Sequence, residues 1–280
     1  MLHPPESWKA DYERDGYLVV EELVDAEALG RLRDAVERIT RDSDALPPNL
    51  RQWVQLERDY FEDQPEYNRD MDAARIGNAV RNIMEIPLFD PVFAELIRHD
   101  PLLDVLEVLF DSCDFHFHNY KCIIKAPRVS SSFRWHRDLP YLQHSSPNLI
   151  TAMLCLDGMT EENGATVVLP SSHRIAHEDV KDSDVEMFDE DLPPGFERKM
   201  VCCPPGSAVL FHVNIIHGGP ANRSDIPRRN LIGIWAGPGA YPVTSARYAY
   251  HGLYPRSRDP DRQAQVQQTF ARLAVPAATA

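Results

Sequence analysis

The sequence has few cysteines, no long hydrophobic run and a deficit of basic residues. No apolar stretch approaches the roughly 18 residues that a membrane-spanning helix requires. The polar beginning, MLHPPESWKADYERDGY, has neither the apolar stretch nor the cleavage site of a signal peptide. The five cysteines are odd in number and include no C-x-x-C pair, which favours reduced thiols. We therefore predict a cytoplasmic protein that does not bind membranes.

The charge balance argues against a further class of partner. With 43 acidic and 29 basic residues, the chain carries a formal net charge of −14. Such a field repels nucleic acid and anionic membranes, so we expect no nucleic-acid partner. Two interpretations of the acidity stay open: it favours a cationic small substrate, or it serves only solubility. The sequence does not define the oligomeric state.

The chain is predicted to form a single domain, since 280 residues suit one large core. Its first part, about residues 1–112, is expected to be mainly helical. A short apolar strand is predicted at 16–24, after which Asp25 can cap a helix with apolar side chains on one face. Residues 74–86 and 90–110 are also predicted to be helical, the second segment with an Asp-Pro pair at its start.

From about residue 113 to 250 the pattern changes to short β-rich runs separated by Gly, Pro, Asn and Ser. Strands that follow one another without intervening helices predict a sandwich or barrel rather than a parallel sheet. An acidic segment, 174–200, interrupts the strands and is interpreted either as a lid or as a plain solvent loop. A C-terminal helix is predicted at about 258–274.

The stretch SSSFRWHRDLPYL contains His136 and Asp138, separated by one residue. On an extended strand, residues two apart point the same way, so both side chains can reach one point. The pair alone is a weak signal, but His217 ends a later β-rich run and supplies a third donor. Two imidazoles and one carboxylate on a β scaffold form the facial triad of non-haem Fe(II) oxygenases, which leaves metal positions open for other ligands.

A second candidate feature follows His217 in the sequence. A bidentate 2-oxoacid cosubstrate has a second carboxylate, which a guanidinium can bind through two parallel charge-assisted bonds. Arg228 and Arg229 stand 11 and 12 residues after His217, at the start of the next β-rich run. Because a strand that follows a turn returns alongside its predecessor, such an arginine can re-enter the barrel.

In combination, several motifs resemble the phytanoyl-CoA dioxygenase family of Fe(II)/2-oxoglutarate-dependent oxygenases. They are, in the family's order, GYLVVEELVDAEALGRLR, WHRDLPY, MTEENGATVVLPSSH, PPGSAVLFHVNIIHGG and ANRSDIPRRNLI, and they cover roughly residues 10–240. The resemblance implies a mainly β fold, with a double-stranded β-helix (jelly-roll, cupin-like) core and flanking helices. It also implies Fe(II), 2-oxoglutarate and O2 as cofactor and cosubstrates.

Residue by residue, the resemblance makes the two histidines and the aspartate of the triad the iron ligands and the catalytic centre. It implies that Arg228, rather than Arg229, is the partner of the distal 2-oxoglutarate carboxylate, and that Asn119 is a further cosubstrate contact. The chain has Gly219 where relatives often carry Ser or Thr. One hydrogen bond to the cosubstrate is therefore expected to be missing or to come from elsewhere.

The implied activity is hydroxylation of an unactivated C–H bond in a small molecule, such as a natural product, an amino acid or an acyl derivative, with release of succinate and CO2. The same cofactor chemistry can give desaturation, epimerisation or cyclisation, and the motifs do not separate these outcomes. Two interpretations of another class stay open: a catalytically silent jelly-roll that binds a ligand, and a zinc hydrolase with the same triad.

Other polar residues have weaker claims to a role. Cys113, His116 and His118 offer a possible second metal cluster, although ordinary hydrogen-bonded histidines are the preferred interpretation. His144 is a candidate substrate contact or a loop histidine. Asn222, near the start of ANRSD, is expected to hold the turn that aims the arginine of the next strand, since such side chains readily bond nearby backbone.

Overall fold

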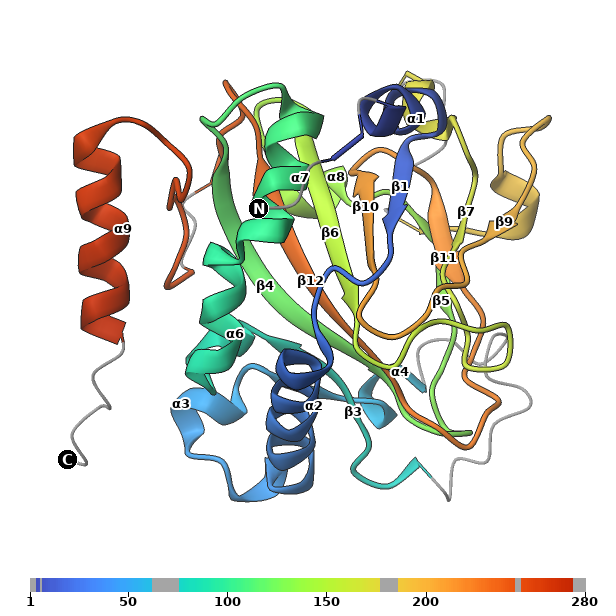
Figure 1. Cartoon of the computed structure of the whole chain (residues 1–280). Coiled ribbons are helices and arrows are strands. Elements are labelled where there is room, and N and C mark those ends of the chain that lie inside the picture. Colours follow the sequence, from blue (N-terminus) through green and yellow to red (C-terminus); the bar gives the residue numbers. More distant parts are fainter. Residues whose placement is uncertain (1–3, 6, 62–75, 177–185, 245–247, 274–280) are drawn as a thin grey trace.

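The protein is described by a computed structural model for residues 4–61 except residue 6, and for 76–176, 186–244 and 248–273. Two antiparallel sheets face each other, and helices cover the outside of the larger one (Figure 1). In the described part, the larger sheet has the spatial order β1 (Tyr17–Val20), β10 (Ala208–His212), β6 (Leu149–Cys155), β12 (Arg228–Ala236), β4 (His116–Lys125), β3 (Val80–Met84) and β2 (Val54–Leu56). The smaller sheet has the order β8 (Glu186–Met187), β5 (Phe133–His136), β11 (His217–Gly219), β7 (Val167–Val168) and β9 (Lys199–Met200).

The helices come mainly from the first part of the chain. They are α1 (Ser7–Asp15), α2 (Ala26–Arg41), α3 (Pro48–Arg51), α4 (Arg58–Phe61), α6 (Pro91–Glu95), α7 (Asp100–Phe110), α8 (Leu139–Leu142) and α9 (Pro260–Leu273). Short 3-10 turns lie at Ser43–Ala45, Ile86–Leu88, Leu96–Arg98, Ser172–Arg174 and Asp189–Asp191. As predicted, Asp25 caps α2, accepting a bond of 2.8 Å from the amide of Ala28. Within the described residues, no helix is long and apolar enough to cross a membrane.

The larger sheet separates an outer apolar core from the space between the two sheets, where the side chains of the candidate site lie. On β4, Phe117, Tyr120 and Cys122 point outward and pack in one cluster with the buried faces of α2, α6 and α7. Lys121 and Lys125 point the other way, toward the smaller sheet, as alternation along a strand requires. Strand β4 therefore contributes to core stability with one face and to a potential site with the other.

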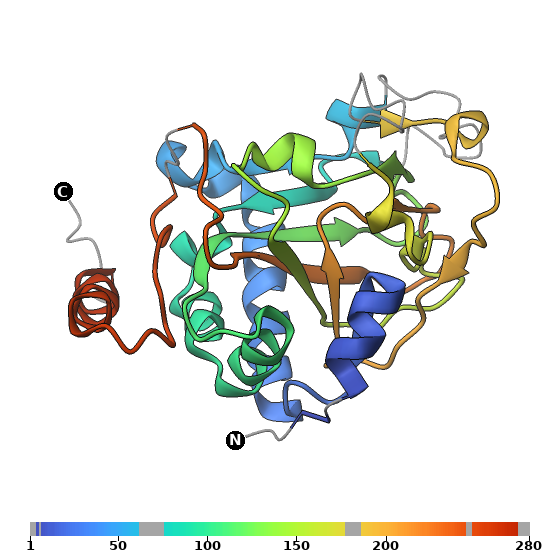
Figure 2. The same ribbon diagram turned by 90° about the horizontal axis from the view of Figure 1, so that it is seen from above.

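The C-terminal helix α9 lies at the edge of the molecule, apart from both sheets (Figures 1 and 2). Its Phe270 contacts the rest of the protein: the ring stands 5.4 Å from that of Tyr250, and the Arg98 guanidinium lies 3.9 Å from its centroid. The helix thus closes the outer core and does not contribute to the space between the sheets.

One segment differs from its sequence-based prediction. Residues 74–86 were expected to be helical, but their described part contains β3, which pairs with β4 on one side and with β2 on the other. Val80 and Ile83 are buried in the outer core from this strand, while Asn82 faces the interior. The pairing with β4 supplies backbone hydrogen bonds that a short helix at this place could not, so tertiary context overrides the local pattern.

The buried face of α2 should account for much of the stability of the outer core. Leu32 is 1% exposed, whereas Glu37 of the same helix points to solvent. We expect Leu32→Ala to lower the free energy of unfolding by about 2–5 kcal/mol because it leaves a cavity. Glu37→Ala, the matched control, should change it by less than about 0.5 kcal/mol. Urea unfolding would measure both, and equal effects would contradict the packing described for α2.

Candidate metal centre

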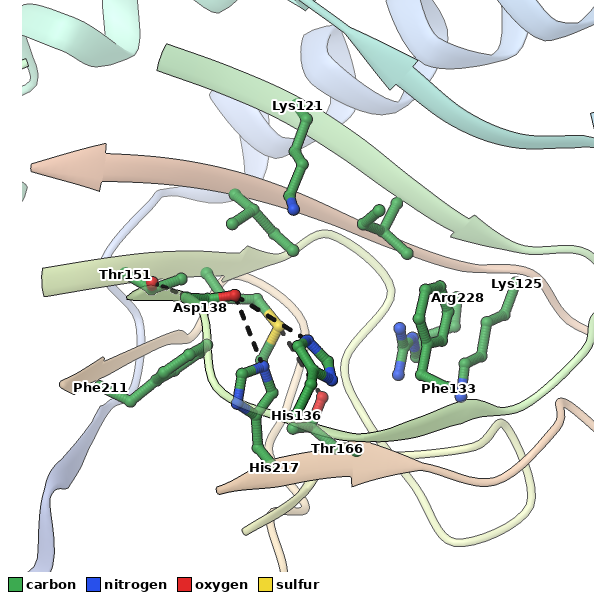
Figure 3. Close-up of a pocket in the computed structure, with 14 residues that line it drawn as sticks. Lys121, Lys125, Phe133, His136, Asp138, Thr151, Thr166, Phe211, His217 and Arg228 are labelled. Carbon is green, nitrogen blue, oxygen red and sulfur yellow. Dashed lines mark hydrogen bonds and ion pairs between the residues drawn. The ribbon is translucent and has the colours of Figure 1, made fainter. Parts of the chain in front are cut away.

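The three predicted metal ligands converge between the two sheets. His136 ends β5, and His217 opens β11 directly opposite it in the antiparallel pair. Asp138 follows at the start of α8, with its Oδ1 3.9 Å from His136 Nε2 and 4.0 Å from His217 Nε2 (Figure 3). One ligand atom of each residue lies within 4.8 Å of the others, and the described residues contain no second group of this kind.

The backbone brings Asp138 to the site in a different way from the one expected. The strand ends at His136, and Asp138 has helical angles, φ −75° and ψ −32°, as the residue before α8. Alternation along a strand therefore does not explain its orientation. Its amide donates to the carbonyl of Val213, at 2.8 Å, which ties this turn to the chain leading into β11. Asp138 is thus held by the same connection that leads to His217.

Hydrogen bonds leave one free lone pair on each candidate ligand. The Nδ1–H of His136 donates to the carbonyl of Arg134 at 2.8 Å, and that of His217 donates to the carbonyl of Ile215 at 3.1 Å. A carbonyl only accepts, so these bonds place the proton on Nδ1 and leave Nε2 free to coordinate.

The carboxylate is oriented in the same manner by a threonine from the facing sheet. The Thr151 hydroxyl of β6 donates to Asp138 Oδ2 at 2.6 Å, and Oδ1 faces the two imidazoles. A bond of this kind to one oxygen favours coordination through the other. Such supporting bonds are typical of metal ligands, because they fix the direction of each donor atom.

The electrostatics keep His136 and Asp138 in a coordinating state. Burial, followed by the proximity of His217, lowers the pKa of His136 to about 4, so this ring is neutral at pH 7. Burial alone would raise the pKa of Asp138, but the two histidines, Lys121 and the Thr151 hydroxyl outweigh it, and the pKa of the carboxyl lies below its usual value. Neutral imidazoles and a carboxylate, without thiolate, are a donor set that fits Fe(II).

Next to the triad, an inner pocket of about 70 Å³ extends to Arg228 at the start of β12. Arg228 is buried and donates through Nη1 to the carbonyl of Gly164 at 2.6 Å. Its buried Nε has no hydrogen-bond partner among the described residues. Burial lowers the pKa of this guanidinium to about 10, which leaves it charged at pH 7. A buried cation with an unused donor fits the carboxylate of a ligand in this pocket.

Lys125 is a second cation of the inner pocket, which the sequence did not single out. It stands opposite Arg228 in the β4–β12 pair, is fully buried, and donates to the carbonyls of Gly164 (3.0 Å) and Pro220. Burial and then the Arg228 charge hold the pKa of its ammonium well below the usual range. An anion between the two side chains would relieve this repulsion. The signal in the sequence was a lysine that closes the apolar run CIIK.

Arg229 points away from the pocket, since neighbouring residues on a strand face opposite sides. Its guanidinium forms a two-pronged ion pair with Asp157, at 2.6 and 2.8 Å. The turn before the strand is held by Asn222, as predicted: its amide donates to the carbonyls of Lys125 and Ile226 at 2.9 and 2.8 Å. Of the two candidate arginines, Arg228 is therefore the one inside the site.

Asn119, the predicted cosubstrate contact, faces the space between the sheets. It lines an outer cavity of about 360 Å³ on the other side of the triad and does not line the inner pocket that contains Arg228. The two spaces share His136 and Asp138, so the triad stands at their junction. A contact between Asn119 and the cosubstrate stays a prediction, and its position is that of a wall residue for a second ligand.

Four other histidines, His116, His118, His144 and His251, gather near the start of β4. His118 packs against His144, with ring centroids 4.6 Å apart, and against His251, at 5.0 Å. Neither His116 nor His118 joins Cys113 in a group suited to a metal within the described part of the chain. Ordinary hydrogen-bonded histidines were the preferred interpretation of this segment. His118 agrees with it, because its Nδ1 shares a hydrogen bond of 3.1 Å with His251 Nδ1, whereas the buried Nδ1 of His116 has no partner among the described residues.

The acidic segment 174–200 contributes to the outer cavity from its described end. Residues 177–185 lie outside the described part. Glu186 and Met187 form β8, which pairs with β5 so that Glu186 stands opposite His136, and Glu186 lines the outer cavity. This part of the segment is a wall of the site, and the choice between lid and solvent loop stays a prediction.

Comparison with known proteins decides the family. The model of the phytanoyl-CoA dioxygenase (PhyH) family matches residues 12–230, well over half of the chain. The chain belongs to this family. The family and the enzyme class predicted from the sequence, an Fe(II)/2-oxoglutarate-dependent dioxygenase, are thereby confirmed.

Similar proteins act on diverse small molecules, to judge from their names. The chain is 24% identical to a probable alpha-ketoglutarate-dependent hypophosphite dioxygenase of Stutzerimonas stutzeri, over 83% of this chain and 79% of the relative. It is 25% identical to an ectoine dioxygenase of Sphingopyxis alaskensis, over 80% and 72%. Among solved structures, the alpha-ketoglutarate-dependent carbocyclase SnoK from nogalamycin biosynthesis superposes with a TM-score of 0.69 at 17% identity, covering 87% of this chain and 88% of that one. This likeness shows a shared fold.

The hydroxyl of Thr151 should strengthen metal binding without touching the metal. We expect Thr151→Val, which keeps the volume and removes the bond to Asp138, to weaken Fe(II) binding about 10- to 100-fold. Thr151→Ser keeps a hydroxyl and should bind nearly as well as the wild type. Anaerobic metal titration would measure both, with thermal unfolding as the folding control. Unchanged affinity in the valine variant would contradict this role.

Proposed function

We propose that the protein hydroxylates an unactivated C–H bond of a small molecule, using Fe(II), 2-oxoglutarate and O2 and releasing succinate and CO2. The observation that carries the proposal is the continuity of the site. Three donors with free lone pairs face one point, two buried cations lie at the end of the inner pocket, and a larger cavity opens on the other side. In this proposal, the metal binds at the three donors, the cosubstrate in the inner pocket and the substrate in the outer cavity.

In this proposal, His136, Asp138 and His217 hold the iron, which together with 2-oxoglutarate supplies the oxidising power for C–H cleavage when both are bound. Arg228 and Lys125 hold the distal carboxylate of 2-oxoglutarate through charge-assisted bonds. Their burial keeps water away from these bonds and strengthens them. The carbonyl of Gly164 accepts from both side chains and so fixes their separation.

Gly219 fits this arrangement. A Cβ built at this residue would lie 3.1 Å from the Ala165 carbonyl and 3.4 Å from Lys125 Nζ. The absence of a side chain leaves room for the lysine, whose ammonium takes the place of the hydroxyl that relatives often carry here. The hydrogen bond expected to be missing is therefore proposed to come from Lys125.

The competing functions find less support. A zinc hydrolase would leave the two buried cations without a purpose, and a silent binding protein would not need Thr151 to orient a metal ligand. Desaturation, epimerisation and cyclisation use the same site and differ in how the substrate lies in the outer cavity. We propose that the site belongs to a single domain with a jelly-roll core. The cytoplasmic location stays a prediction from the sequence.

Loss of any triad residue should abolish the metal-dependent function. In anaerobic wild-type protein, Fe(II) with 2-oxoglutarate should give a weak visible charge-transfer band. His136→Ala, Asp138→Ala and His217→Ala should each lose both this band and turnover of 2-oxoglutarate, while circular dichroism stays unchanged. Full activity in any one of them would exclude that residue as a ligand.

The two buried cations should determine the affinity for 2-oxoglutarate. We expect Arg228→Met and Lys125→Met each to raise the concentration required by at least about tenfold, since each removes a charge-assisted bond. Arg229→Met is the matched control, because its guanidinium pairs with Asp157 outside the pocket and should leave the requirement unchanged. The dependence of the charge-transfer band on 2-oxoglutarate measures all three. An effect only in the Arg229 variant would contradict the assignment.

A further inference from the structure

The outer cavity contains one charge that the proposed function does not use. Tyrosines aside, six of its lining residues have ionisable side chains. Arg81 pairs with buried Glu57 at 3.1 Å, and Arg134 lies 3.6 Å from Glu186. The remaining three are the two metal ligands His136 and Asp138, and Lys121. Among the described residues, Lys121 is the one charged side chain of this wall without an ion-pair partner of its own.

The position of Lys121 is at the junction of the two spaces. It lines both the inner pocket and the outer cavity, and in Figure 3 its ammonium points from β4 toward the triad. Its neighbours across the sheet are apolar on both sides, Met84 on β3 and Ile232 on β12. The carboxylate of Asp138 senses its charge, but the two oxygens of that carboxylate serve Thr151 and the metal position.

An ammonium between apolar neighbours needs a partner, because partial burial removes water from the charge. The cosubstrate's distal carboxylate is already held at Lys125, four residues along the same strand, which is about 13 Å away between Cα atoms. Lys121 therefore marks a separate position for an anion, nearer to the outer cavity. The same inward face of β4 continues to Asn119, which lines the outer cavity. This strand therefore borders the cosubstrate at one end and the substrate at the other.

We propose that Lys121 binds an anionic group of the substrate, a carboxylate or a phosphorus oxoanion, and thereby fixes which C–H bond faces the metal. The proposal rests on the proposed function of the site. It opposes the expectation of a cationic substrate drawn from the net charge of −14. On the cavity wall, the carboxylate of Asp138 faces the metal position and that of Glu186 pairs with Arg134, whereas the charge without an ion-pair partner, that of Lys121, is positive. The local charge selects the ligand at short range, and the distant surface charges are screened.

The test uses the whole protein, anaerobic, with Fe(II) and saturating 2-oxoglutarate, so that the inner pocket is occupied. Four probes of similar size differ in charge: butyrate, propylphosphonate, butyramide and n-butylammonium. Isothermal titration calorimetry should detect binding of at least one of the two anions, and which of them binds identifies the oxoanion. The neutral amide and the cation should bind at least about tenfold more weakly.

Variants separate this site from the cosubstrate site. Lys121→Met should weaken binding of the anionic probe about 10- to 100-fold while leaving the dissociation constant for 2-oxoglutarate unchanged. Lys121→Arg keeps the charge and should retain binding within a few fold. Lys125→Met, the matched control on the same strand, should show the opposite pattern, with weakened binding of 2-oxoglutarate.

Three outcomes would overturn the inference: equal binding of amide and anion by the wild type, binding of the anion by Lys121→Met at wild-type strength, or a loss of 2-oxoglutarate rather than probe affinity in that variant. The last would place Lys121 on the cosubstrate. Failure of the proposed function is a separate result, because the wild type would then show no charge-transfer band with Fe(II) and 2-oxoglutarate before any probe is added.

Discussion

The antiparallel pairing of β5 with β11 is the constraint on which the site depends. It sets His136 directly opposite His217, and a slip of one residue would turn one of the two rings away from the interior. Close approach of the two strands is possible because Gly218 has no side chain: a Cβ there would lie 2.9 Å from the carbonyl of Phe133 and 3.1 Å from that of Arg134. The glycine after the histidine is therefore part of the geometry that makes a ligand pair.

The larger sheet supplies the polar and charged side chains that surround the pair of histidines. Its inward face provides the hydroxyl that orients the carboxylate, the two cations of the inner pocket and Lys121 at the junction. Its outward face is buried beneath α2, α6 and α7. Because adjacent residues of one strand serve these two purposes, the charged side chains are held on a rigid support. The support thus holds two like-charged side chains side by side in an arrangement that a bound anion would stabilise.

The sequence predicted the candidate ligands because two histidines and one aspartate form a chemically restrictive donor set, although the strand alternation expected to orient Asp138 was wrong. The spacing left Arg228 and Arg229 open and the family resemblance favoured Arg228; the alternation of β12 explains why only one of them can enter. Lys125 and Lys121 escaped notice, because a lysine in an apolar strand does not reveal from sequence whether it faces a ligand or solvent. The strand at 80–84 was mistaken for a helix, since short apolar patterns are ambiguous and the decisive partner, β4, is distant in the chain. Net charge was the least informative signal, because it averages over surfaces that never meet the substrate.

The two ligand imidazoles share a local feature, which is that each donates to the carbonyl two residues before its own. The contact that sets each ring's direction is thus contained in three consecutive residues. A substitution that distorts the backbone of either three-residue unit would misdirect one donor even where all three candidate ligands are intact, so the residues just before each histidine belong to the site as much as the histidine does.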